Sequence, residues 1–80
     1  MRARLLEAIA EHERGELDHA GLKAMVERAL RTLDHAHDSE RQALFEADIA
    51  LEYAMDGSPP DGDPVAPLKR MRRNLREALR

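Results

Sequence analysis

Apolar residues recur along this chain at the three- and four-residue spacing of an amphipathic helix, and no stretch alternates apolar and polar residues as a strand would. The spacing predicts helices over residues 2–14, 19–35 and 39–56, and a last one from 64 or 67 to 80. The residues of the predicted stripes, in helix order, are Leu5, Ala8, Ile9 and His12; Leu22, Met25, Val26, Ala29, Leu30 and Leu33; Leu44, Ala47, Leu51, Ala54 and Met55; Leu68, Met71, Leu75 and Leu79. We therefore expect an all-α fold, a small up-and-down bundle of three longer helices plus a basic C-terminal helix.

Turn and capping residues separate these segments. Gly15 suits the left-handed position that ends a helix, and Asp18 suits the N-cap of the next. Ser39 and Gln42 have the spacing of a capping box, which starts the third helix. A Pro- and Gly-rich stretch, 57–64, ends it and forms a loop or hinge before the last helix. The chain is thus expected to be one domain, 1–80, in which the last helix either docks or swings on that loop.

The composition limits how such a bundle is stabilised. The chain has 80 residues, no cysteine, one Phe and one Tyr, so disulfides and thiolate zinc sites are excluded. A core this small rarely contributes more than about 3–5 kcal/mol of net stability, which favours burial against another chain, most simply in a homodimer. No uncharged run is long enough to span a membrane, and Glu7 interrupts any signal-peptide apolar region. We expect a cytoplasmic protein, and its Arg- and Ala-rich composition suggests a GC-rich bacterial genome.

The net charge of −3 conceals a division along the chain. Residues 65–80 hold six basic residues against Glu77, a charge of +5, so residues 1–64 carry −8. On a helix, five of these basic side chains fall in one arc beside the apolar stripe. We call this arc the basic face: Lys69, Arg72, Arg73, Arg76 and Arg80.

Two interpretations of the basic face remain open from the sequence. The first is binding of an anionic partner: clustered arginines neutralise phosphates and so favour nucleic acid, and a basic amphipathic helix also suits an anionic membrane surface or an acidic protein. Two features count against nucleic acid: the overall charge is negative, and no Phe or Tyr lies among the arginines to provide a platform for base stacking. The second is structural: the last helix packs beside the third helix of its own or a second copy, and its basic residues pair with Glu46, Asp48, Glu52 and Asp56.

The third helix carries a second apolar stripe, about 140° around the helix from the first. We call it the aromatic stripe: Phe45, Ile49 and Tyr53. An 80-residue bundle has little material to cover two faces of one helix. The stripe is therefore predicted to bind a partner, with these three residues as anchors and Glu46, Asp48 and Glu52 steering the contact. The alternative is a central third helix, covered on one side by the first two helices and on the other by the last.

Candidate chemistry is sparse. The run Asp34-His35-Ala36-His37-Asp38 contains possible metal ligands, but helix capping explains it more simply, and we predict no metal there. Glu16 and His19 have a Glu-x-x-His spacing but straddle a predicted turn. The chain has no cysteine, its two serines occupy cap and turn positions, and its four glycines are isolated, so a catalytic nucleophile and a phosphate loop are both missing.

These observations predict a non-enzymatic protein–protein interaction module that self-associates and needs no cofactor. Its class would be an adaptor, antitoxin, immunity or regulatory protein. The first alternative is a nucleic-acid-binding protein that uses the basic face, and the second is a bundle that binds metal through its His and Asp residues.

Overall fold

The computed structural model describes residues 2–32, 38–56 and 65–80, which form four helices and no strand. The helices are α1 (Arg2–Glu13), α2 (His19–Thr32), α3 (Asp38–Asp56) and α4 (Val65–Leu79). The all-α prediction is confirmed. At 15 residues, α4 is longer than α1 with 12 and α2 with 14, so the C-terminal helix is a full member of the bundle.

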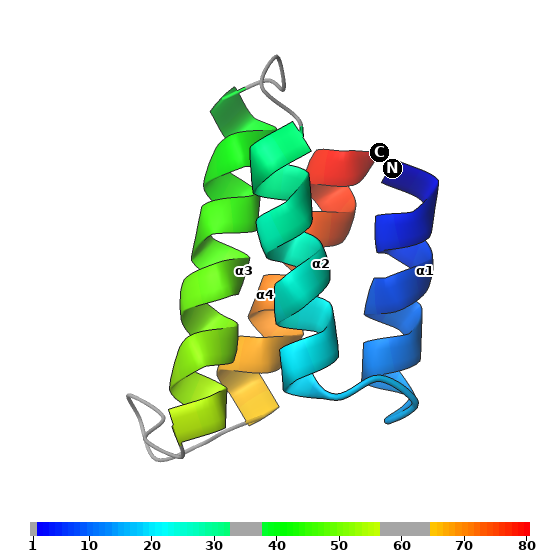
Figure 1. Ribbon diagram of the computed structural model, residues 1–80, viewed down its shortest axis with the longest axis vertical. Coiled ribbons are helices and arrows are strands. Elements are labelled where there is room, and N and C mark those ends of the chain that lie inside the picture. The colour runs from blue at the N-terminus through cyan, green and yellow to red at the C-terminus, as the bar shows by residue number, and fades with distance from the viewer. Residues whose placement is uncertain (1, 33–37, 57–64) are drawn as a thin grey trace.

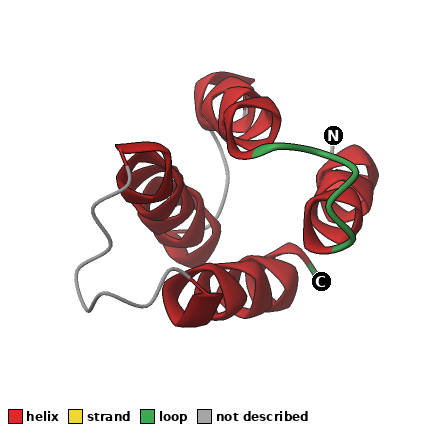
Figure 2. Ribbon diagram, turned by 90° about the horizontal axis from the view of Figure 1, so that it is seen from below, coloured by secondary structure: helices red, strands yellow, loops and turns green. Residues whose placement is uncertain are grey.

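Consecutive helices run in opposite directions and close into a ring in the order α1, α2, α3, α4 (Figures 1 and 2). Each helix packs against the two beside it, including α4 against α1, and the diagonal pairs make no comparable contact. Both chain ends lie at the same end of the bundle (Figure 1). Because α4 packs against both α3 and α1, it is docked on the bundle.

The core consists of one stripe from each helix. Its buried apolar residues are Leu5, Ala8 and Ile9; Leu22, Val26 and Ala29; Leu44, Ala47 and Leu51; Met71, Leu75 and Leu79. Met55, predicted in the core stripe of α3, is instead 50% exposed. The reason is length: α3 has 19 residues, and its last turn extends past the end of α2 (Figure 1). Leu33 lies outside the described residues.

The turn between α1 and α2 forms as the sequence predicts. Gly15 has a φ of 80° and donates its N–H to the His12 carbonyl at 3.1 Å, while the N–H of Glu16 bonds the Glu11 carbonyl at 2.8 Å. This pair of bonds is a Schellman motif. Asp18 caps α2, since its Oδ1 accepts the N–H of Gly21 at 2.7 Å.

Gly21 permits this cap to pack closely. A Cβ atom at this position would lie 2.6 Å from Leu17 Cδ1 and 3.0 Å from Asp18 Oδ1. Leu17, just before the cap, is packed against the core. Glycine has a low helix propensity, but at position 21 it leaves the space that the Leu17 side chain occupies.

Candidate functional site

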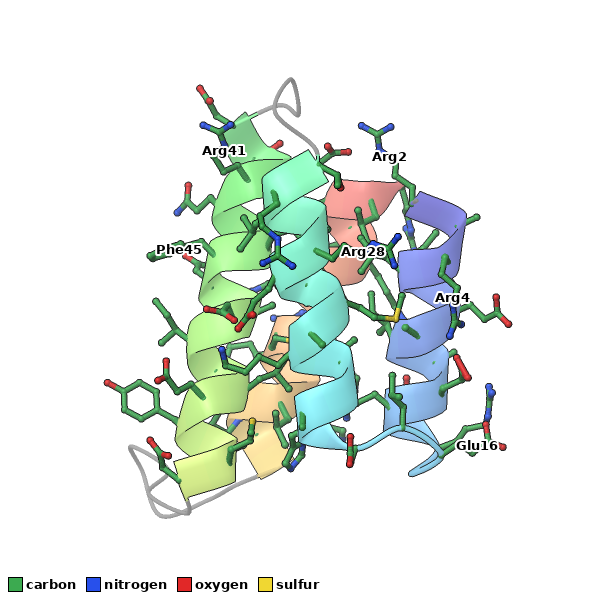
Figure 3. All side chains as sticks on the ribbon, in the orientation of Figure 1. Arg2, Arg4, Glu16, Arg28, Arg41 and Phe45 are labelled. Atoms are coloured by element: carbon green, nitrogen blue, oxygen red, sulfur yellow. The ribbon has the colours of Figure 1, made fainter. Side chains whose placement is uncertain are left out.

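The aromatic stripe faces solvent. Phe45 is 59% exposed, Ile49 40% and Tyr53 49%, although they lie on the longest helix of the bundle. Figure 3 shows Phe45 projecting from α3 away from the other helices. Because the ring uses a single face of each helix for the core, α2 and α4 both meet α3 on its other side. The alternative of a central third helix covered on both faces is therefore wrong.

Carboxylates border the stripe. Glu46, Glu52 and Asp56 are exposed, and Glu46 accepts a hydrogen bond from the Gln42 amide at 3.3 Å. Ile49, Tyr53, Glu52 and Asp56 line a shallow hollow at the C-terminal half of α3. The arrangement is an apolar centre with an anionic rim, as in a protein interface.

Asp48, which the sequence assigned to steering, is placed differently. It accepts a hydrogen bond from Lys23 Nζ at 3.0 Å, and Lys23 also bonds Glu27. These carboxylates raise the pKa of the Lys23 ammonium, and Lys23 in turn lowers the pKa of Glu27. Asp48 therefore ties α3 to α2.

The basic face turns toward α1 rather than α3. Arg76 forms an ion pair with Glu13, and Arg72 Nη1 lies 3.2 Å from His12 Nδ1. Within the described ranges, no ion pair joins α4 to Glu46, Asp48, Glu52 or Asp56, so the expected pairing with α3 is not found. The physical reason is that the basic arc lies on the flank of α4 that borders α1, once the ring is closed.

A chain of hydrogen bonds at the end of the bundle where α1 leads into α2 involves His12, which is only 7% exposed. A guanidinium can only donate, so Arg72 fixes His12 Nδ1 as an acceptor and leaves the proton on Nε2. That Nε2 donates to His19 Nδ1 at 2.9 Å. Burial lowers the pKa of His12, the charge of Arg72 and then His19 lower it further, and Asp18 opposes the shift. The arrangement therefore requires neutral His12.

A buried carboxylate that the sequence reasoning missed lies at the opposite end. Glu40 is 4% exposed, and its two oxygens accept Arg2 Nε at 2.7 Å and Arg2 Nη2 at 2.9 Å. The bond raises the pKa of the Arg2 guanidinium. The only signal in the sequence was an acidic residue in the first turn of a helix, which is ordinarily explained by the helix dipole.

Most of the possible metal ligands in the run 34–38 lie outside the described residues. Asp34, His35 and His37 lie outside the described residues, and Asp38 is the first residue of α3. Among the residues that are described, no group of three His, Asp or Glu side chains is arranged to hold a metal ion. Glu16 pairs with Arg14 and His19 contacts His12, so the Glu-x-x-His spacing does not form a joint site.

Comparison with protein-family models, with curated proteins and with solved structures finds no match to this chain. Within residues 2–32, 38–56 and 65–80, none of the helices has the length and apolar character needed to cross a bilayer. The described part of the chain thus presents two distinctive surfaces, the aromatic stripe and the basic face.

Proposed function

We propose that this protein is a non-enzymatic interaction module that pairs with a second copy of itself through the aromatic stripe. The observation that carries the proposal is the 40–59% exposure of Phe45, Ile49 and Tyr53 on a single face of α3. Large apolar side chains gathered on one exposed face are typical of an interface. Adaptor, antitoxin, immunity and regulatory proteins work by covering a surface in this way.

The spacing of the stripe is self-complementary. Phe45 and Tyr53 lie four residues before and after Ile49, so a two-fold axis beside Ile49 places two α3 helices antiparallel. Each Phe45 then meets the partner's Tyr53, which gives two aromatic pairs. Each such pair contributes about 0.5–1.5 kcal/mol beyond the area it buries.

The charged residues also favour the antiparallel arrangement. At 100° per residue, Arg41 and Glu52 lie beside the stripe on its Phe45 side, and Asp56 has a direction between those of Phe45 and Ile49. Arg41 is near one end of the helix and the two carboxylates are toward the other. A two-fold axis brings identical flanks together in opposite directions. Arg41 therefore lies near the partner's Asp56. The opposed helix dipoles add to this preference.

The expected dimer is weak and depends on concentration. Burying the exposed half of each of the three side chains contributes about 0.7–1.5 kcal/mol, or about 4–9 kcal/mol for both copies. The two aromatic pairs add about 1–3 kcal/mol. Association itself costs at least about 4 kcal/mol, so the dimer is expected to form at micromolar or higher concentrations.

Light scattering across a protein concentration series tests the proposal. The wild-type mass should rise toward twice that of one chain, and Ile49→Glu should hold the mass at that of one chain with unchanged helical circular dichroism. Met55→Glu is the matched control, because Met55 is 50% exposed on the same helix but outside the stripe. A wild-type protein that stays monomeric, or equal loss of pairing in both variants, would overturn the proposal.

A further inference from the structure

We infer that the basic face of α4 binds the phosphate backbone of double-stranded nucleic acid, without sequence preference. This inference is independent of pairing through α3. It begins from the charge distribution: residues 65–80 carry +5, whereas the rest of the chain carries −8. The protein thus concentrates positive charge on one helix although its net charge is −3.

The side chains available for phosphate are identified by their partners. Lys69, Arg73 and Arg80 are exposed, and within the described part of the chain none of them forms an ion pair or hydrogen bond. Arg72 and Arg76 lie between them and are oriented by His12 and Glu13. The face therefore combines three cations that have no ion-pair partner in the described ranges with two that are held in place.

The face is slightly concave and rigidly supported. Lys69, Arg72, Arg73 and Arg76 line one surface depression with Glu13, its only carboxylate. The opposite side of α4 is fixed to the core through Met71, Leu75 and Leu79, which are 6%, 0% and 3% exposed. The arginines are thus presented by a docked helix, which limits the entropy lost when they bind a ligand.

The dimensions suit a phosphate backbone. From residue 69 to residue 80, α4 spans about 16 Å, which corresponds to about five phosphates of one strand of a duplex. Arginine forms bidentate bonds with phosphate, and four of the five residues of the face are arginines. Since α4 contains no Phe, Tyr or Trp, it offers nothing on which unpaired bases could stack, and this favours a duplex over a single strand.

Other polyanions fit less well. Insertion into an anionic membrane requires apolar side chains beside the basic ones, but those of α4 are directed into the core.

The acidic rim of the aromatic stripe lies on α3, which is across the ring from α1 (Figure 2). Of the rim carboxylates, Glu46 borders α4, but it lies beside Arg70 and Asn74. Arg72 and Arg76 of the basic face instead contact α1. The Debye length of about 8 Å at physiological salt further screens the rim from a duplex bound to the basic face.

Fluorescence anisotropy with two labelled DNA duplexes of unrelated sequence tests the inference. Both should bind with equal affinity in low salt. With three or four phosphate contacts, the affinity should fall about 40- to 150-fold when the salt is raised from about 50 to about 200 mM. The double variant Lys69→Glu/Arg73→Glu should bind at least about tenfold more weakly in low salt.

The control is Arg28→Glu/Arg31→Glu, which changes the charge equally with two exposed arginines of α2, diagonally across the ring from α4. It should alter affinity less than about threefold. Labelled polyglutamate should bind at least about tenfold more weakly than DNA, since its single flexible chain has a lower charge density than a duplex, which carries one charge per about 1.7 Å of its axis. Undetectable DNA binding in low salt, equal losses in both double variants, or polyglutamate binding as tight as that of DNA would each overturn the inference.

Discussion

Truncating Leu75 tests whether α4 is an integral part of the bundle. This side chain is fully buried, at 0% exposure, and lies at the centre of the apolar stripe of α4. Leu75→Ala should cost about 2–5 kcal/mol, the range for buried leucines that leave a cavity. This cost is comparable with the net stability of only about 3–5 kcal/mol expected of a core this small. With an unfolding entropy of about 2.1 cal/mol/K per residue, the loss lowers the melting temperature by about 12–30 °C.

The assay is thermal and urea unfolding followed by far-ultraviolet circular dichroism. Arg70→Ala is the control, because Arg70 is an exposed residue of the same helix and makes no ion pair within the described ranges. Its melting temperature should stay within about 3 °C of wild type, as for most surface changes. If Leu75→Ala shifted the melting temperature no more than Arg70→Ala, α4 would not be docked, and the rigid presentation of the basic face would be refuted.

The remaining predictions concern His12 and the turn that joins α1 to α2. The pKa of His12 is lowered in the folded state, so the unfolded chain binds protons more readily. The free energy of unfolding should therefore fall as the pH drops from about 7.5 to about 5.5. The fall should be less steep in His12→Gln. A urea midpoint that does not change over this range would contradict the assignment. Gly15→Ala should lower the free energy of unfolding by about 1–2 kcal/mol. The cause is the positive φ alone, because nothing lies within 4 Å of an added Cβ. Gly15→Asn should lower it less, since Asn tolerates a positive φ better. Asp18→Ala should cost about 1 kcal/mol in urea unfolding, and no loss would mean that the cap does not stabilise α2.

Local features of the fold could be predicted because their causes lie within a few residues. The cap at Asp18, the left-handed Gly15 and the stripe of α1 that includes His12 all depend on neighbours in sequence. Met55 was predicted wrongly because periodicity gives a direction around the helix and says nothing of where the facing helices end.

Contacts between distant residues could not be predicted, because they depend on how the ring closes. Arg2 and Glu40 are 38 residues apart, and Arg76 and Glu13 are 63 apart. The charge pattern indicated that the basic residues of α4 would form ion pairs with carboxylates, and the sequence favoured those of α3. Once α4 lies between α3 and α1, its basic flank borders α1, and Glu13 becomes the partner.

The aromatic stripe falls between these cases. The spacing of Phe45, Ile49 and Tyr53 was evident from the sequence, but whether the chain covered them was not. That depended on whether α3 would be central or would take one corner of a ring. In the ring, each helix contributes one face to the core, so the stripe is exposed.

The most direct test of pairing through α3 uses the absence of cysteine from the chain. If the two-fold axis passes beside Ile49, packed helices whose axes are about 8–10 Å apart bring the two Cα atoms within the reach of a disulfide. Mild oxidation of Ile49→Cys should therefore give a covalent dimer on a non-reducing gel, whereas Met55→Cys, on the same helix, should remain a single chain. Equal cross-linking of the two variants, or none with Ile49→Cys, would contradict the account.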